Sequence, residues 1–61
     1  MGNMFSRFSP KQRVLIVGMD NYPARVVLVK FGVETNYQIE YWYNGEIKSV
    51  EVFEDEITEA K

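Results

Sequence analysis

The fold of this chain is decided by residues 37–53, which read YQIEYWYNGEIKSVEVF. Two runs rich in aromatic and β-branched residues flank Asn44-Gly45. Asn-Gly is the strongest short signal for a two-residue hairpin loop, because a type I′ turn needs positive φ at both central positions. We therefore predict an antiparallel hairpin with strands at 37–43 and 46–53.

The two-residue loop also sets the register of this hairpin, and the register assigns each side chain to a face. Trp42 stands opposite Ile47, and side chains alternate between the two faces along each strand. The face that carries Trp42 and Ile47 is otherwise polar. The opposite face carries six apolar side chains and is the predicted core face: Tyr37, Ile39, Tyr41, Tyr43, Val50 and Val52.

The rest of the chain supplies shorter elements. Residues 13–17 and 24–31 are β-branched runs bounded by loop-forming residues, which is typical of strands. In residues 53–57, Phe53 and Ile57 flank three acids, which predicts one helical turn that lays both side chains on the core. A short last strand follows at 57–58. We assign the domain to residues 10–58, a flexible arm to residues 1–9 and a frayed end to residues 59–61.

These elements predict an all-β fold, a small SH3-like antiparallel barrel of four to five strands with a short helical turn near the C-terminus. The alternative is a sheet of three or four strands that dimerises to cover its apolar face.

The composition excludes several classes of chemistry. A chain of 61 residues forms a single small domain of marginal stability, and this one has no cysteine and no histidine. It therefore lacks disulfides and the ligands of zinc, haem and iron–sulfur sites, as well as the commonest general base. We predict that it is not an enzyme and needs no cofactor or metal. With no run of ~20 apolar residues, we also predict a cytoplasmic protein without a membrane segment.

Three stretches carry a resemblance to a known group of folds. Residues 37–45, together with 50–53 and 56–57, resemble the Tudor and chromo-barrel group of SH3-like domains. Residues 8–14, FSPKQRV, resemble the Phe-x-x-Gly-Asp-x-Val opening of small bacterial and phage SH3-like barrels, which include the YodC-like proteins. The WYNG of residues 42–45 is similar to the Trp-Tyr/Phe-Asp-Gly of that last family. In this chain Lys11-Gln12 replaces the usual Gly-Asp.

Trp42 and Ile47 are the first candidate site, because they are apolar on a polar face. As an exposed anchor they would bind a protein partner together with Tyr22, since tryptophan is enriched at interface hot spots. The alternative is that twist or a covering arm, through Phe5 and Phe8, buries the pair.

Charge suggests a second candidate site. Residues 1–33 hold five of the seven Lys and Arg, whereas residues 34–61 hold eight of the nine acids, so the net charge of −2 conceals a strong asymmetry. A basic first half would meet the phosphates of nucleic acid. The same asymmetry would also suit self-association into a structural assembly. The candidate nucleic-acid contacts are Arg7, Lys11, Arg13, Arg25 and Lys30.

Three weaker patterns have simpler explanations. Tyr22, Tyr37, Tyr41, Trp42 and Tyr43 include the residue types of a methyl-lysine cage. Core tyrosines are the preferred interpretation, because alternation places Trp42 on the opposite face from the three strand tyrosines. Residues 1–6 fit a myristoylation pattern that a loose arm matches by chance. The acids Glu54, Asp55, Glu56 and Glu59 lack the spacing of a calcium loop, so we interpret them as a solvated turn.

Overall fold

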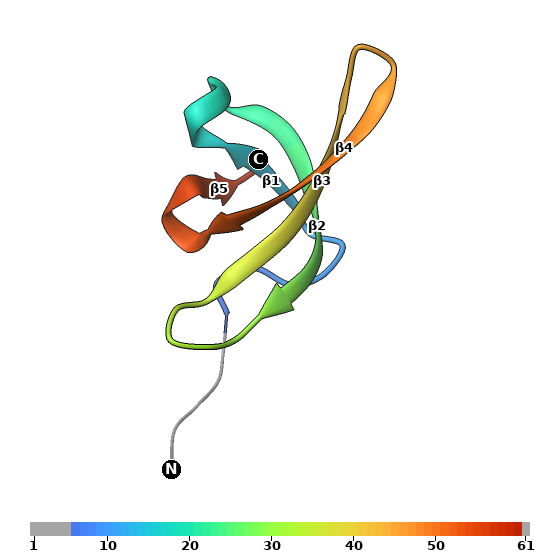
Figure 1. Cartoon of the computed structure of the whole chain (residues 1–61). Helices are drawn as coiled ribbons and strands as arrows, with labels where there is room; N and C mark the ends of the chain where they lie inside the picture. The colour runs from blue at the N-terminus through green and yellow to red at the C-terminus, as the bar shows by residue number, and fades with distance from the viewer. Residues whose placement is uncertain (1–5, 61) are drawn as a thin grey trace.

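The structure is a computed structural model that describes residues 6–60. Its strands form one antiparallel sheet in the order β4-β3-β2-β1-β5 (Figure 1). The predicted all-β class, the number of strands and the short helical turn before the last strand are confirmed. The elements are β1 (Arg13–Ile16), η1 (Val17–Met19), β2 (Tyr22–Lys30), β3 (Asn36–Tyr43), β4 (Glu46–Phe53), η2 (Glu54–Glu56) and β5 (Ile57–Glu59).

The β3–β4 hairpin has the register that the sequence predicts. Trp42 pairs with Ile47 and Tyr43 with Glu46 across the turn. Asn44 and Gly45 have φ values of 53° and 77°, as a type I′ turn requires. The Asn-Gly dipeptide therefore fixes the pairing of β3 with β4.

The sheet curls around its core. The β2–β3 ladder has an irregularity between Val26 and Leu28, and such bulges increase the local twist of a strand. Figure 1 shows β2 curving through the molecule, and in the order of the sheet β1 and β5 follow on one side of it and the β3–β4 hairpin on the other. At the end of the chain, β5 pairs with the free side of β1, so that Ile57 at its start lies opposite Ile16 at the end of β1.

The core contains one residue of the predicted flexible arm, which is a correction to that prediction. Phe8 is only 1% exposed, and its ring meets that of Tyr37 edge to face with centroids 5.4 Å apart. The aromatic pair has the geometry that the quadrupoles of the two rings favour. The other buried side chains are Val14, Ile16, Ala24, Val26, Ile39 and Ile57.

A tight turn connects Phe8 to β1. Lys11 adopts a φ of 73°, in the left-handed region that favours glycine. Its N–H donates to the carbonyl of Val26 at 2.7 Å, and the Gln12 N–H donates to the carbonyl of Ser9 at 3.1 Å. The Gln12 side chain accepts a further hydrogen bond from the Ser9 N–H at 2.9 Å. These bonds hold Phe8 over the sheet.

Part of the predicted core face of the hairpin is exposed. Tyr37 and Ile39 are buried as expected, whereas Tyr43 and Val50 are exposed. Figure 1 shows the cause for Tyr43, because the turn end of the hairpin projects beyond the rest of the sheet. Val50 lies on β4, an edge strand with a neighbour on one side only.

Phe53 is a second correction near the end of the chain. The predicted helical turn buries Ile57, but Phe53 is 49% exposed because it is the last residue of β4 and points away from the core. The N–H of Phe53 donates to the carboxylate of Glu56 at 2.7 Å, so a side chain of η2 holds the start of this turn. Glu59, which we expected to fray, belongs to β5.

Candidate functional site

A hollow of about 700 Å³ opens beside Trp42 and Ile47. Besides Val14, Tyr22, Ala24, Tyr41 and Ala60, its lining includes one apolar residue from each of four neighbouring strands: Leu15 of β1, Pro23 of β2, Trp42 of β3 and Ile47 of β4. We call these four residues the apolar row.

Strand register explains why these four side chains form a row. Leu15 pairs with Pro23, and Trp42 pairs with Ile47. Arg25 of β2 pairs with Glu40 of β3, and Pro23 and Trp42 each lie two residues along the strand from one member of that pair, on the same side of the sheet. Because paired residues point to the same side of a sheet, the row lies on one face.

The row is open rather than covered. Trp42 is 63% exposed and Ile47 is 55% exposed. Of the two aromatic residues considered as a cover, Phe8 lies in the core and Phe5 lies outside the described residues. The structure therefore favours the exposed alternative for the Trp42–Ile47 pair.

Tyr22 lies at the first position of β2 and supports the strand beneath Trp42. Its hydroxyl donates a hydrogen bond to the carbonyl oxygen of Trp42. Its ring packs edge to face against Tyr41 at 5.7 Å and Tyr43 at 6.2 Å between centroids. Tyr22 also lines the hollow, so the three residues predicted as a partner site are brought together. Tyr37 lies apart in the core, so the five aromatic residues considered as a cage do not form one.

Two of the five predicted cations lie at the same hollow. Arg13 and Arg25 face each other across the β1–β2 ladder, and both line the hollow. Like charges directly opposite each other destabilise a sheet. Glu40, the partner of Arg25 on the other side, also lines the hollow. In residues 6–60 neither arginine has a carboxylate within ion-pair distance.

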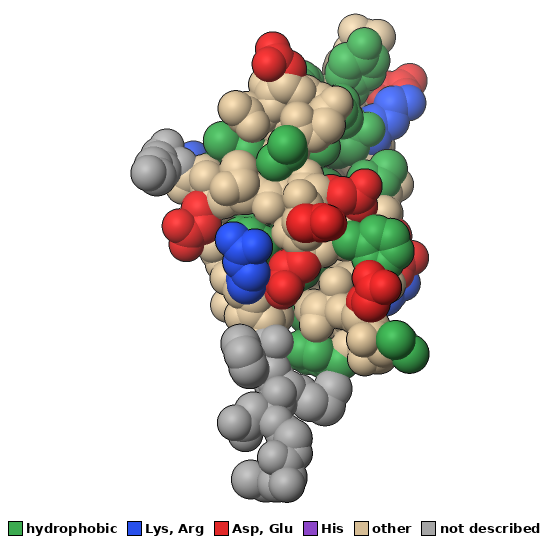
Figure 2. Space-filling view, turned by 90° about the vertical axis from the view of Figure 1, so that its left-hand side faces the viewer, with side chains coloured by type: hydrophobic (Ala, Val, Ile, Leu, Met, Phe, Trp, Pro, Cys, Tyr) green, Lys and Arg blue, Asp and Glu red, His purple; other side chains and the backbone are tan. Residues whose placement is uncertain are grey.

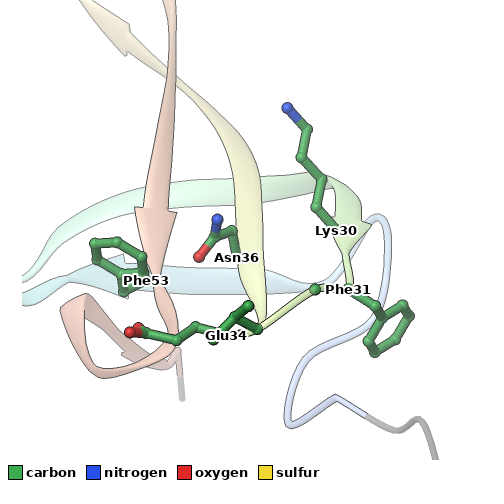
Figure 3. Close-up of a pocket in the computed structure, with 7 residues that line it drawn as sticks. Lys30, Phe31, Glu34, Asn36 and Phe53 are labelled. Carbon is green, nitrogen blue, oxygen red and sulfur yellow. The ribbon is translucent and has the colours of Figure 1, made fainter.

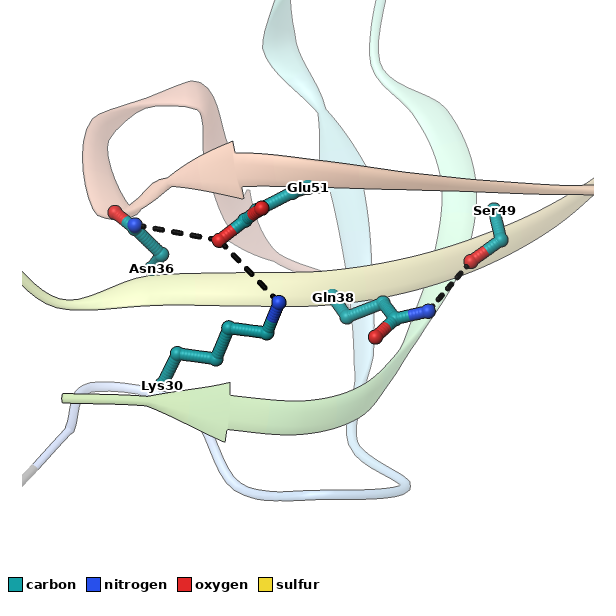
Figure 4. A network of polar contacts seen from close by, with 5 residues as sticks. All are labelled: Lys30, Asn36, Gln38, Ser49 and Glu51. Atoms are coloured by element: carbon teal, nitrogen blue, oxygen red, sulfur yellow. Dashed lines mark hydrogen bonds and ion pairs between the residues drawn. The ribbon is translucent and has the colours of Figure 1, made fainter.

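The other three cations lie elsewhere. Lys30 forms an ion pair with Glu51 at 3.6 Å, and the same carboxylate oxygen accepts from the Asn36 amide at 3.4 Å (Figure 4). Lys11 is held in the turn before β1. Arg7 lies with its guanidinium carbon 5.2 Å from the centroid of the Phe8 ring. The structure therefore does not gather the five basic residues into one surface.

A second hollow of about 290 Å³ lies at the β2–β3 loop. Figure 3 shows that Phe31 and Phe53 stand on opposite sides of it and do not converge. Its cation, Lys30, is the one already paired with Glu51. Within the described residues, this hollow offers neither converging aromatic side chains nor an unpaired cation, so we take the larger one as the candidate site.

A polar cluster joins the N-terminal segment to η2. The Tyr37 hydroxyl donates to the Glu54 carboxylate and accepts from the Arg7 N–H at 3.1 Å. Burial, together with the bond to Glu54, raises the pKa of Tyr37 above its usual value. The bond from Tyr37 lowers the pKa of Glu54. This cluster stabilises the fold and lies away from the apolar row.

The side of the molecule formed by η2 and β5 is strongly acidic. Figure 2 shows acidic side chains gathered across the middle of this face, with a basic side chain beside them. Within residues 6–60 no group of three or more Asp, Glu, His or Cys side chains is placed to hold a metal ion. Glu54, one of the four acids considered for that role, is instead bound to Tyr37.

Comparison with protein-family models, curated proteins and solved structures finds no match for this chain. In the described part of the chain no helix has the length and apolar character needed to cross a membrane.

Two residues of the apolar row were absent from the predicted site. Leu15 alternates with the buried Val14 and Ile16, so strand periodicity places it on the face away from the core. Pro23 carried no such signal, because proline within a predicted loop indicates a turn rather than a strand.

Proposed function

We propose that this chain is a small SH3-like interaction module that binds a segment of a partner protein on the apolar row. The observation that carries the proposal is the exposure of Trp42 and Ile47 side by side at a hollow. A contiguous apolar patch with a polar rim is typical of interaction sites on monomeric proteins. Tryptophan contributes much of the binding energy at such sites.

The backbone at Lys11 supports the SH3-like part of the proposal. Residue 11 stands where the resembling bacterial and phage barrels have the Gly of Gly-Asp. Its φ of 73° is the conformation in which glycine is preferred. Gln12 stands at the Asp position, and its side chain accepts from a backbone N–H in the turn.

The support of Trp42 by the rest of the sheet favours a preformed site. Tyr22 holds the backbone carbonyl of Trp42 and packs between Tyr41 and Tyr43. A side chain on a rigid strand loses little conformational entropy when it binds, because its backbone is already ordered.

Selection from a displayed library of random peptides tests the proposal. Wild-type protein and Val33→Ala should enrich the same peptides, since Val33 is fully exposed in the β2–β3 loop away from the row. Trp42→Ala should lose them while keeping the far-ultraviolet circular dichroism of the folded protein. Peptides that bind the Trp42→Ala variant as well as the wild type would contradict the proposal.

A further inference from the structure

Arg13 and Arg25 lie beside the apolar row in a defined geometry. Each stands two residues along its strand from a member of the row, Arg13 from Leu15 and Arg25 from Pro23. Two residues of β-strand span roughly 6.6 Å, and both side chains of such a pair point to the same face. The hollow therefore presents an apolar surface and, about 7 Å further along the strands, a pair of cations.

The two arginines leave a demand for negative charge. They face each other directly, which is unfavourable unless an anion lies between them. In the described residues their only carboxylate neighbour in the hollow is Glu40, and it makes no ion pair with either. A guanidinium binds a carboxylate through two parallel hydrogen bonds, so one acidic side chain would satisfy this pair well.

An extended peptide carries the matching spacing. Side chains i and i+2 of a β-strand point to the same side at the same separation of roughly 6.6 Å. We propose that the hollow selects extended partner segments in which an Asp or Glu lies two residues from a bulky apolar residue. This inference rests on the proposed function, because it specifies the chemistry of the partner that the apolar row receives.

The charges of the hollow favour an acidic peptide over nucleic acid. Binding to a phosphate backbone depends on several cations along one track. Among the cations of residues 6–60, only Arg13 and Arg25 line the hollow, where Glu40 lies beside them, and Lys30 is paired with Glu51 at a different place. The hollow holds two cations and one carboxylate. A peptide with one carboxylate and one apolar side chain matches these charges better than a polyanion does.

The peptide selection described above tests the inference when its enriched sequences are read out. The expected sequences carry Asp or Glu two residues from Phe, Leu, Ile, Met or Trp. Enriched sequences that depend on Trp42 but lack this spacing would overturn the inference and leave the proposed function standing. Absence of any Trp42-dependent sequence would overturn both.

Quantitative binding then uses the most enriched acidic peptide and its copy with the acid changed to the amide. Trp42 is the only tryptophan in the chain, so its fluorescence reports occupancy of the hollow. We expect the amide peptide to bind about tenfold more weakly, and Arg25→Gln to remove most of the difference between the two peptides. Equal affinity of the acidic and amide peptides would overturn the inference.

Two further variants separate a local role of charge from a general one. Glu40→Gln removes the carboxylate from the hollow and should tighten binding of the acidic peptide by about threefold, because it removes a repulsion. Lys30→Gln removes a distant cation and should leave the affinity unchanged. If Lys30→Gln weakens binding as much as Arg25→Gln, the net charge of the chain decides affinity and the inference fails. Binding of a short oligothymidylate that is tighter than that of the acidic peptide would also overturn it.

Discussion

Tyr37 donates a hydrogen bond from its hydroxyl to the carboxylate of Glu54, and this bond connects strand β3 to the η2 turn. The same carboxylate oxygen accepts from the N–H of Arg7 at 3.3 Å. Because Arg7 precedes the buried Phe8, the bond also holds the N-terminal segment in place over the core.

We expect the stability of the protein to fall at both ends of the pH range through this bond. The hydrogen bond from Tyr37 lowers the pKa of Glu54 in the folded protein. The contribution of Glu54 to the free energy of unfolding is therefore fully present above the unfolded pKa of about 4.3, and it is lost as the pH falls through the lower folded pKa. Burial and the bond to Glu54 raise the pKa of Tyr37 in the folded protein. The contribution of Tyr37 to the free energy of unfolding is therefore fully present below the unfolded pKa of about 10, and it is lost as the pH rises through the higher folded pKa. Urea unfolding across the pH range measures both limits.

Tyr37→Phe is the matched control for this pH dependence. It keeps the ring packed against Phe8 and removes only the hydroxyl, which should cost about 1 kcal/mol near pH 7. The variant should lose the alkaline decline and show a smaller acid decline. An unchanged pH profile in Tyr37→Phe would show that other groups govern it.

Lys11→Gly should stabilise the fold. A φ of 73° costs a residue with a side chain about 1–2 kcal/mol of backbone strain, which glycine avoids. Part of that gain is offset because glycine loses more conformational entropy on folding. We expect a net gain of roughly 0.5–1 kcal/mol in the free energy of unfolding. Lys11→Ala serves as the control, because it also removes the charge but keeps the strain. An equal gain in both variants would assign the effect to charge.

Gly45→Ala should destabilise the hairpin by about 1 kcal/mol, because φ at this position is +77°. A Cβ at this position would meet no other atom within 4 Å, so the cost is confined to the backbone. Gly18 is equally uncrowded, and its φ lies outside the left-handed region, so Gly18→Ala should be close to neutral. Similar losses in melting temperature for the two variants would argue against a type I′ turn at Asn44-Gly45.

Trp42→Ala and Ile39→Ala should separate binding from stability. Ile39 is fully buried, and its truncation should cost about 2–5 kcal/mol. Trp42 is mostly exposed, and its truncation should cost less than about 1 kcal/mol. Urea titration followed by circular dichroism measures both. A loss in Trp42→Ala as large as that in Ile39→Ala would show that the side chain belongs to the core.

The hairpin and its register follow from the sequence because a two-residue Asn44-Gly45 loop permits one pairing. Burial along the hairpin does not follow from alternation alone. Tyr43 has the periodicity of a core residue, yet it lies where the hairpin extends past its neighbouring strands. Phe8 is the opposite case, since no periodic pattern surrounds it, and its burial depends on the turn at Lys11.

The sequence predicts only part of the candidate site, because it reveals local strand pairing but not pairing between distant strands. Trp42 and Ile47 face each other through local pairing, which the sequence reveals. The approach of Arg13 to Arg25 depends on the register between β1 and β2, which are separated by a longer loop without a turn of defined type. Pairings that join distant strands are set by packing, so only the structure brings the arginines to the apolar row.

The ladder between β1 and β5 has a consequence for the order of folding. It pairs residues that are far apart in the sequence, Ile16 and Ile57, whereas a loop of only two residues connects β3 to β4. Loop-closure entropy makes the short connection form first and the long one last. We expect the hairpin to act as the early template and β5 to dock late, once residues 57–59 reach β1. Until then the N-terminal strand has one partner instead of two, and the buried side of Ile16 stays open to solvent.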